Sequence, residues 1–137
     1  EKEDEGLIKD LLLWMERGGE DFTNTFVFLS KKKPLKNKSF KGGDFLKWHE
    51  RWLNRLQKNK KGSDSSFKLM GKTNPLIIPR NHRVEEVLSA MSVNKNLDPL
   101  NDFIKALKKP YEGGLEIAPY RSPPPAGSSQ YKTFCGT

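Results

Sequence analysis

The chain has 137 residues and a formal net charge of +8, with 34% hydrophobic and 31% charged residues. The length is enough for one domain with a modest core, but the apolar fraction is low for a domain that folds by itself. No run of 18 apolar residues occurs, so these residues contain no membrane-spanning segment. The single cysteine excludes an internal disulfide framework and favours a reducing, cytosolic setting.

The charge is distributed unevenly along the chain. Residues 1–30 carry a net charge of −5, residues 31–61 carry +10 and residues 62–137 carry +3. The basic character is therefore local. The chain opens on Glu1 rather than Met, and we expect it to be cut from a longer protein.

Two helices are predicted within residues 1–30. Asp4 is expected to cap the first, which Gly18-Gly19 ends near Arg17. Its apolar side chains recur at helical spacing: Leu7, Leu11, Trp14 and Met15. Asp21 is expected to cap the second helix, whose apolar stripe is Phe22, Phe26 and Leu29.

A third helix is predicted over residues 44–57, after a polar connection at 31–43, with Asp44 as its cap. Its apolar face is formed by Phe45, Trp48, Trp52 and Leu56. Two tryptophans on one stripe need a large surface to cover them. Residues 58–69, rich in Lys, Gly and Ser, are predicted to be a flexible loop.

Residues 70–109 combine a proline-bracketed segment with two more helices. Pro75 and Pro79 disfavour helix before them and predict an extended or turned stretch, buried through residues 76–78. A fourth helix should start at residues 80–83. The fifth should have Asp98 as cap with Pro99 at the first helical position, and should end before Pro110.

The remaining residues, 110–137, form a long, irregular, proline-rich tail. The predicted fold is therefore all-α, with about five helices in a single region spanning 1–137.

Three stretches, taken together and in order, resemble the selenoprotein O family. They are Asp21-Phe22-Thr23-Asn24-Thr25-Phe26, the run from Asn74-Pro75-Leu76 through Pro79-Arg80-Asn81-His82 to Glu85, and the ending Tyr131-Lys132-Thr133-Phe134-Cys135-Gly136-Thr137. The resemblance covers nearly the whole chain and is to the last quarter or so of such proteins.

This resemblance implies that the chain is the C-terminal subdomain of a kinase-like (pseudokinase) fold. Members of the family transfer AMP from ATP to Ser, Thr or Tyr of proteins, using a divalent metal such as Mg²⁺. Their nucleotide- and metal-binding residues lie upstream, so no catalytic residue and no metal ligand is assigned within residues 1–137. The implied partners are the upstream catalytic domain and protein substrates, in the cytoplasm of a bacterium or the mitochondrion of a eukaryote.

Cys135 is the one position to which the resemblance assigns chemistry. Family members carry selenocysteine or cysteine near this terminus, which implies a redox role. We expect a reversible disulfide with a cysteine of the catalytic part; the alternative is an inert terminal thiol. Lys132 nearby would favour the thiolate modestly.

Residues 74–82 gather groups that could form a site, but a structural clasp is the favoured interpretation. The prolines fix the backbone, and Asn74 can bond local amides as a turn or cap residue. Arg80 and His82 then provide donors for carbonyls or for acidic groups of a neighbouring lobe. The predicted clasp residues are Asn74, Pro75, Pro79, Arg80, Asn81 and His82. Two histidines, His49 and His82, without a cysteine pair do not predict a metal site.

The basic stretch 31–61 supports an alternative function, an independent basic module that binds nucleic acid or an acidic protein. Against it, the aromatic side chains occupy an apolar helix face and do not alternate with the lysines as a stacking platform. We favour a scaffold that packs on the catalytic part through Trp14, Trp48 and Trp52, each worth about 1.5–3 kcal/mol when buried.

Overall fold

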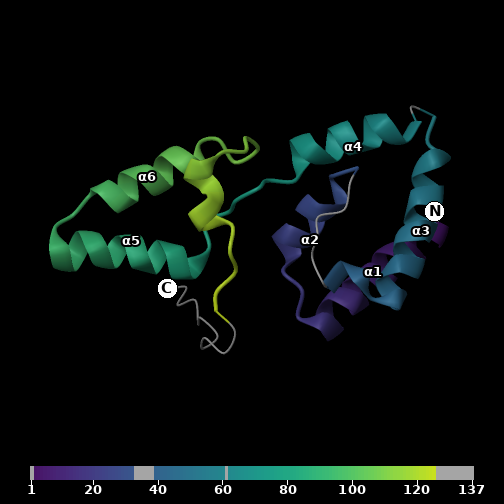
Figure 1. Cartoon of the computed structure of the whole chain (residues 1–137), viewed down its shortest axis with the longest axis horizontal. Coiled ribbons are helices and arrows are strands. Elements are labelled where there is room, and N and C mark those ends of the chain that lie inside the picture. The colour runs from purple at the N-terminus through teal and green to yellow at the C-terminus, as the bar shows by residue number, and fades with distance from the viewer. Residues whose placement is uncertain (1, 33–38, 61, 126–137) are drawn as a thin grey trace. The chain divides into compact units, whose positions relative to one another are not determined.

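The computed structural model describes residues 2–32, 39–60 and 62–125. Within these ranges the chain forms six α-helices and two 3₁₀ helices, without a β-strand (Figure 1). The predicted all-α class is confirmed. The chain divides into two compact units, Glu1–Pro75 and Leu76–Thr137, where the sequence predicted one continuous region.

The first unit contains α1 (Lys2–Gly18), α2 (Phe22–Leu29), the 3₁₀ helix η1 (Ser39–Lys41), α3 (Gly43–Gln57) and α4 (Gly62–Thr73). Gly19, at φ +60°, makes the left-handed turn that ends α1. Asp21 caps α2 as predicted, because its carboxylate accepts a hydrogen bond from the Asn24 amide at 2.9 Å.

The predicted caps of three other helices are wrong. Asp4 lies in the first turn of α1, which begins at Lys2. Gly42, not Asp44, holds the cap position of α3, and Asp44 lies in the first turn. Asp98 likewise lies in the first turn of α6 (Asp98–Leu107), behind Leu97 at the cap position. Both carboxylates still favour the positive end of the helix dipole. The Asn96 side chain caps instead, accepting from the Asp98 amide at 3.0 Å.

The predicted flexible loop over 58–69 is wrong from Gly62 onward, because α4 occupies Gly62–Thr73. The same helix includes residues 70–73, which were predicted to begin the proline-bracketed segment. The Gly-Ser composition has weak helix propensity, but packing overrides it. The Phe67 ring packs edge-on against Trp52, with 5.9 Å between the ring centroids. The side-chain Nδ2 of Asn59 donates to Ser66 Oγ at 3.1 Å.

The core of the first unit lies between α1, α2, η1 and α3. Its buried members are Leu7, Leu11, Met15, Phe28, Leu29, Phe40, Phe45 and Trp48. Aromatic rings dominate it: Phe28 stacks on Phe40 at 3.8 Å, and Trp14 lies 4.6 Å from Phe45. Aromatic pairs of this kind stabilise beyond their buried area.

The second unit begins with a non-helical stretch and continues as α5 (Asn81–Asn94), α6 and the 3₁₀ helix η2 (Leu115–Tyr120). Figure 1 shows α5 and α6 side by side, with η2 against α6. Lys95, at φ 55°, closes α5 in the left-handed conformation. The predicted starts of α5 and α6 are confirmed to within a residue or two.

The predicted irregular tail is wrong over its first part. Residues Leu115–Tyr120 form η2, and Ile117 is 3% exposed in a small core with Ile77 and Ala106. Of the expected buried run 76–78, Ile77 is buried and its two neighbours are half-buried. The Leu76 amide donates to the Pro110 carbonyl at 2.7 Å, which fixes this stretch beside the end of α6.

Candidate functional site

Ion pairs connect the acidic helix α1 to the basic helix α3. Arg55 Nε and Nη2 donate to the two carboxylate oxygens of Asp4 at 2.6 and 3.1 Å. Arg51 Nη1 donates to Asp10 Oδ2 at 2.8 Å, and Lys58 lies 3.4 Å from Glu3. Three cations of the basic segment noted in the sequence are therefore paired with carboxylates of the acidic segment.

The bidentate pair is the best-formed of these contacts, because a guanidinium fork matches the two carboxylate oxygens. The hydrogen bonds from Arg55 hold the pKa of Asp4 below its ordinary value of 3.8. In the same way, the hydrogen bond from Lys32, at 2.6 Å, lowers the pKa of Asp64.

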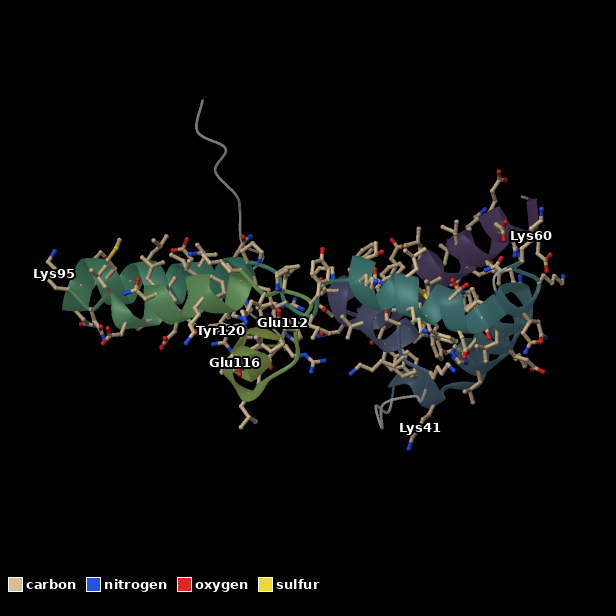
Figure 2. All side chains as sticks on the ribbon, turned by 90° about the horizontal axis from the view of Figure 1, so that it is seen from above. Lys41, Lys60, Lys95, Glu112, Glu116 and Tyr120 are labelled. Atoms are coloured by element: carbon tan, nitrogen blue, oxygen red, sulfur yellow. The ribbon has the colours of Figure 1, made fainter. Side chains whose placement is uncertain are left out.

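These pairs weaken the interpretation of the basic stretch as a nucleic-acid surface. Arg51, Arg55, Lys58 and Lys32 all have carboxylate partners within the first unit. Figure 2 shows two other cations, Lys41 and Lys60, at separate places on that unit. A groove that tracks a phosphate backbone needs its cations gathered.

The tryptophans and His49 serve the core of the first unit. Trp48 Nε1 donates to the Leu7 carbonyl oxygen at 2.8 Å, a buried bond that joins α3 to α1. His49 stacks on Phe45 at 5.6 Å, and partial burial lowers the pKa of its imidazole from 6.5. A neutral imidazole between aromatic rings acts as a packing group.

A groove runs between α1 and α3 beside this core. Its walls carry charges of both signs together with apolar surface: Asp10, Leu13, Trp14, Arg17, Gly18, Asp44, Lys47, Trp48 and Arg51. Arg51, one of these cations, forms an ion pair with Asp10. The mixture of carboxylates and cations gives no preference for a phosphate group.

An exposed apolar surface, which the sequence patterns did not single out, lies on the outer side of α1. Ile8, Leu12 and Leu13 are 59%, 45% and 37% exposed, and they line a shallow depression with Glu5, Lys9 and Glu16. We call Ile8, Leu12 and Leu13 the α1 outer face. Its signal was available in the sequence: residues 11–13 are three consecutive leucines, which one helix stripe cannot all bury.

The predicted clasp residues are distributed over both units. Asn74 and Pro75 end the first unit, whereas Pro79, Arg80, Asn81 and His82 belong to the second. Asn74 Nδ2 donates to Ser30 Oγ at 2.8 Å, which ties the end of α4 to the end of α2. Arg80 is 9% exposed at the cap position of α5, and Asn81 and His82 begin that helix. Recognition of a neighbouring lobe by these groups stays a prediction.

Cys135, the predicted redox position, lies outside the described residues. Across residues 2–32, 39–60 and 62–125, no group of three or more His, Cys, Asp or Glu side chains is placed to hold a metal ion. No helix in those ranges is long and apolar enough to cross a membrane.

The described part of the chain thus has the features of a helical scaffold: an aromatic core, interhelical ion pairs and an open apolar face. A family model described as "Protein adenylyltransferase SelO" matches residues 1–108. The chain belongs to this SelO family, which confirms the resemblance.

Curated relatives support the assignment. The protein nucleotidyltransferase YdiU of Bacillus mycoides (strain KBAB4) is 42% identical over 137 residues, which cover 100% of this chain and 28% of that protein. Proteins of the same name from Nitrosococcus oceani and Pelagibacter ubique are 39% and 41% identical, with the same coverage of each chain. No solved structure matches. The chain spans 28% of the length of these relatives.

Proposed function

We propose that this chain is the C-terminal helical part of a protein adenylyltransferase, which transfers AMP from ATP to hydroxyl groups of Ser, Thr or Tyr in proteins. The observation that carries the proposal is the family match over residues 1–108, together with relatives named protein nucleotidyltransferase that align along the whole chain. ATP and Mg²⁺ would bind in the remainder of the polypeptide, where metal and basic groups neutralise the phosphates.

The role proposed for residues 1–137 is to support that remainder. The first unit suits this role because it is internally braced: α1 and α3 share the Trp48–Leu7 hydrogen bond and the Asp4–Arg55 pair. A braced surface holds a neighbouring domain in one geometry, and phosphoryl chemistry depends strongly on position.

Two radiolabels test the activity. The longer polypeptide that contains this chain, incubated with Mg²⁺ and a protein acceptor, should label the acceptor from ATP that carries the label on its α-phosphate. ATP labelled on the γ-phosphate should give no label, since pyrophosphate leaves. Residues 1–137 alone are the matched control and should be inactive. Labelling from the γ-phosphate, or by residues 1–137 alone, would contradict the proposal.

We also propose that Cys135 forms a reversible disulfide with a cysteine of the catalytic part. The support is its near-terminal position in a family whose members carry cysteine or selenocysteine there. An oxidant should shift the mobility of the longer polypeptide on non-reducing gels, and Cys135→Ser should abolish the shift. An unshifted wild-type protein would contradict this role.

A further inference from the structure

Helix α1 has more apolar surface than the first unit covers. Leu7, Leu11 and Met15 face the core and are 5–6% exposed. The next residue after each of the two leucines, Ile8 and Leu12, points about 100° further round the helix and stays exposed. A helix on the surface of a globular protein carries polar groups there.

The three side chains of the α1 outer face form one continuous apolar surface that lines a shallow depression. Ile8 and Leu12 are one helical turn apart, and Leu13 adjoins Leu12. The depression that they line is mainly apolar, and its charged lining residues are Glu5, Lys9 and Glu16. Contiguous apolar patches with polar rims mark interaction surfaces.

We propose that the α1 outer face is covered by a segment of the same polypeptide that lies outside these 137 residues. This inference rests on the proposed function. The chain spans 28% of the length of its relatives, so most of a family polypeptide is available to provide the cover. The depression is lined by two carboxylates, Glu5 and Glu16, and one cation, Lys9, so the covering segment should have an apolar centre and a net positive flank.

The same charges disfavour a second copy of the chain as the occupant. In a two-fold pairing of α1 outer faces, helices that run antiparallel would bring Glu5 of one copy close to Glu16 of the other. Like charges brought together at an interface weaken it.

The Trp48 side chain, which the sequence suggested as an anchor for another domain, is 6% exposed and packs in the core of the first unit.

Photo-crosslinking tests this assignment in the longer polypeptide. Leu12→benzoylphenylalanine should crosslink, within one polypeptide, to a peptide outside residues 1–137. Ile8→benzoylphenylalanine should reach the same segment, which guards against misfolding at one position. Leu69→benzoylphenylalanine is the matched control, because Leu69 is 66% exposed on α4, away from this depression.

The outcomes separate the alternatives. A crosslinked product of twice the mass would identify a second copy and overturn the proposal. Reaction only within residues 1–137, or a yield at positions 8 and 12 no higher than at 69, would also overturn it. The readout does not need activity: crosslinking without AMP transfer would refute the proposed function alone, and AMP transfer without crosslinking would refute the docking surface alone.

Discussion

At the scale of single residues, the Asp4–Arg55 pair shows how a surface contact becomes specific. Its two hydrogen bonds, at 2.6 and 3.1 Å, use the guanidinium fork, and a lysine could not reproduce that geometry. The two residues are 51 positions apart, so the pair fixes the register of α1 against α3.

The pair predicts a pH dependence of stability. Because the hydrogen bonds lower the folded-state pKa of Asp4, the carboxylate stabilises the fold above its unfolded pKa and loses this contribution as the pH falls through the folded value. Asp4→Asn should therefore lower the Tm at pH 7 and have no such effect at a pH well below 3.8. Thermal unfolding monitored by circular dichroism measures both values. An equal loss at both pH values would show that the charge is not responsible. Glu5→Gln, an exposed carboxylate on the same helix, is the control.

Single residues also show where sequence patterns stop being informative. The apolar stripes predicted correctly that Trp14 and Trp48 would pack against other apolar side chains. They were expected to pack on another domain, whereas both pack in the core of the first unit. In the structure the Trp48 indole bonds to a carbonyl 41 residues away. Helical periodicity identifies which side chains must be covered, and it cannot say which element covers them.

At the scale of elements, Asn74 connects two helix ends. Its amide donates to Ser30 Oγ at 2.8 Å, and Ser30 Oγ donates to the Phe26 carbonyl at 2.7 Å. Thus a residue from the proline-bracketed motif adds side-chain hydrogen bonding at the C-terminus of α2, where the Ser30 backbone amide already donates to the Phe26 carbonyl at 3.1 Å.

A double-mutant cycle tests this link. Asn74→Ala and Ser30→Ala should each cost about 1 kcal/mol or more, since each removes the half-buried hydrogen bond that joins the two side chains. Because that bond is lost only once, the double variant should cost less than the sum. Urea unfolding followed by circular dichroism gives the three free energies. Thr73→Ala removes only a local, exposed bond to the Leu69 carbonyl and should have a smaller effect. Strict additivity would mean that Asn74 and Ser30 act independently.

Elements were predicted with uneven success, for a physical reason. A clear stop signal predicted the end of α1 to within one residue of Gly18, but its start was predicted about three residues too late. Helix α4 was missed because Gly62-Ser63-Asp64-Ser65-Ser66 is a poor helix former, and Phe67 packing on Trp52 compensates only in the folded chain. The α1 outer face was missed because sequence alone did not separate covered from uncovered leucines.

At the scale of the whole molecule, the two units differ in how much core they possess. Among the described residues, the first unit has nine buried hydrophobic residues, whereas the second has five. In the second unit, Leu88 and Ile104 belong to the predicted apolar stripes and remain 41% and 42% exposed. A core of this size rarely supports folding by itself.

Expressed separately, residues 1–75 should fold and residues 76–137 should not. The first fragment should give a dispersed amide spectrum by NMR and unfold cooperatively, because its core lies within its own sequence. The second should give narrow amide dispersion, and its helicity should rise when the rest of the polypeptide is supplied. Cooperative unfolding of 76–137 in isolation would show that a core of five buried hydrophobic residues is sufficient.

The division into two units has a spectroscopic consequence. All three tryptophans, at positions 14, 48 and 52, belong to the first unit, and all three tyrosines, at 111, 120 and 131, belong to the second. Indole emission excited selectively at the red edge of absorption therefore senses only residues 1–75. Tyrosine emission arises only from residues 76–137, so the two signals report on different units of the chain.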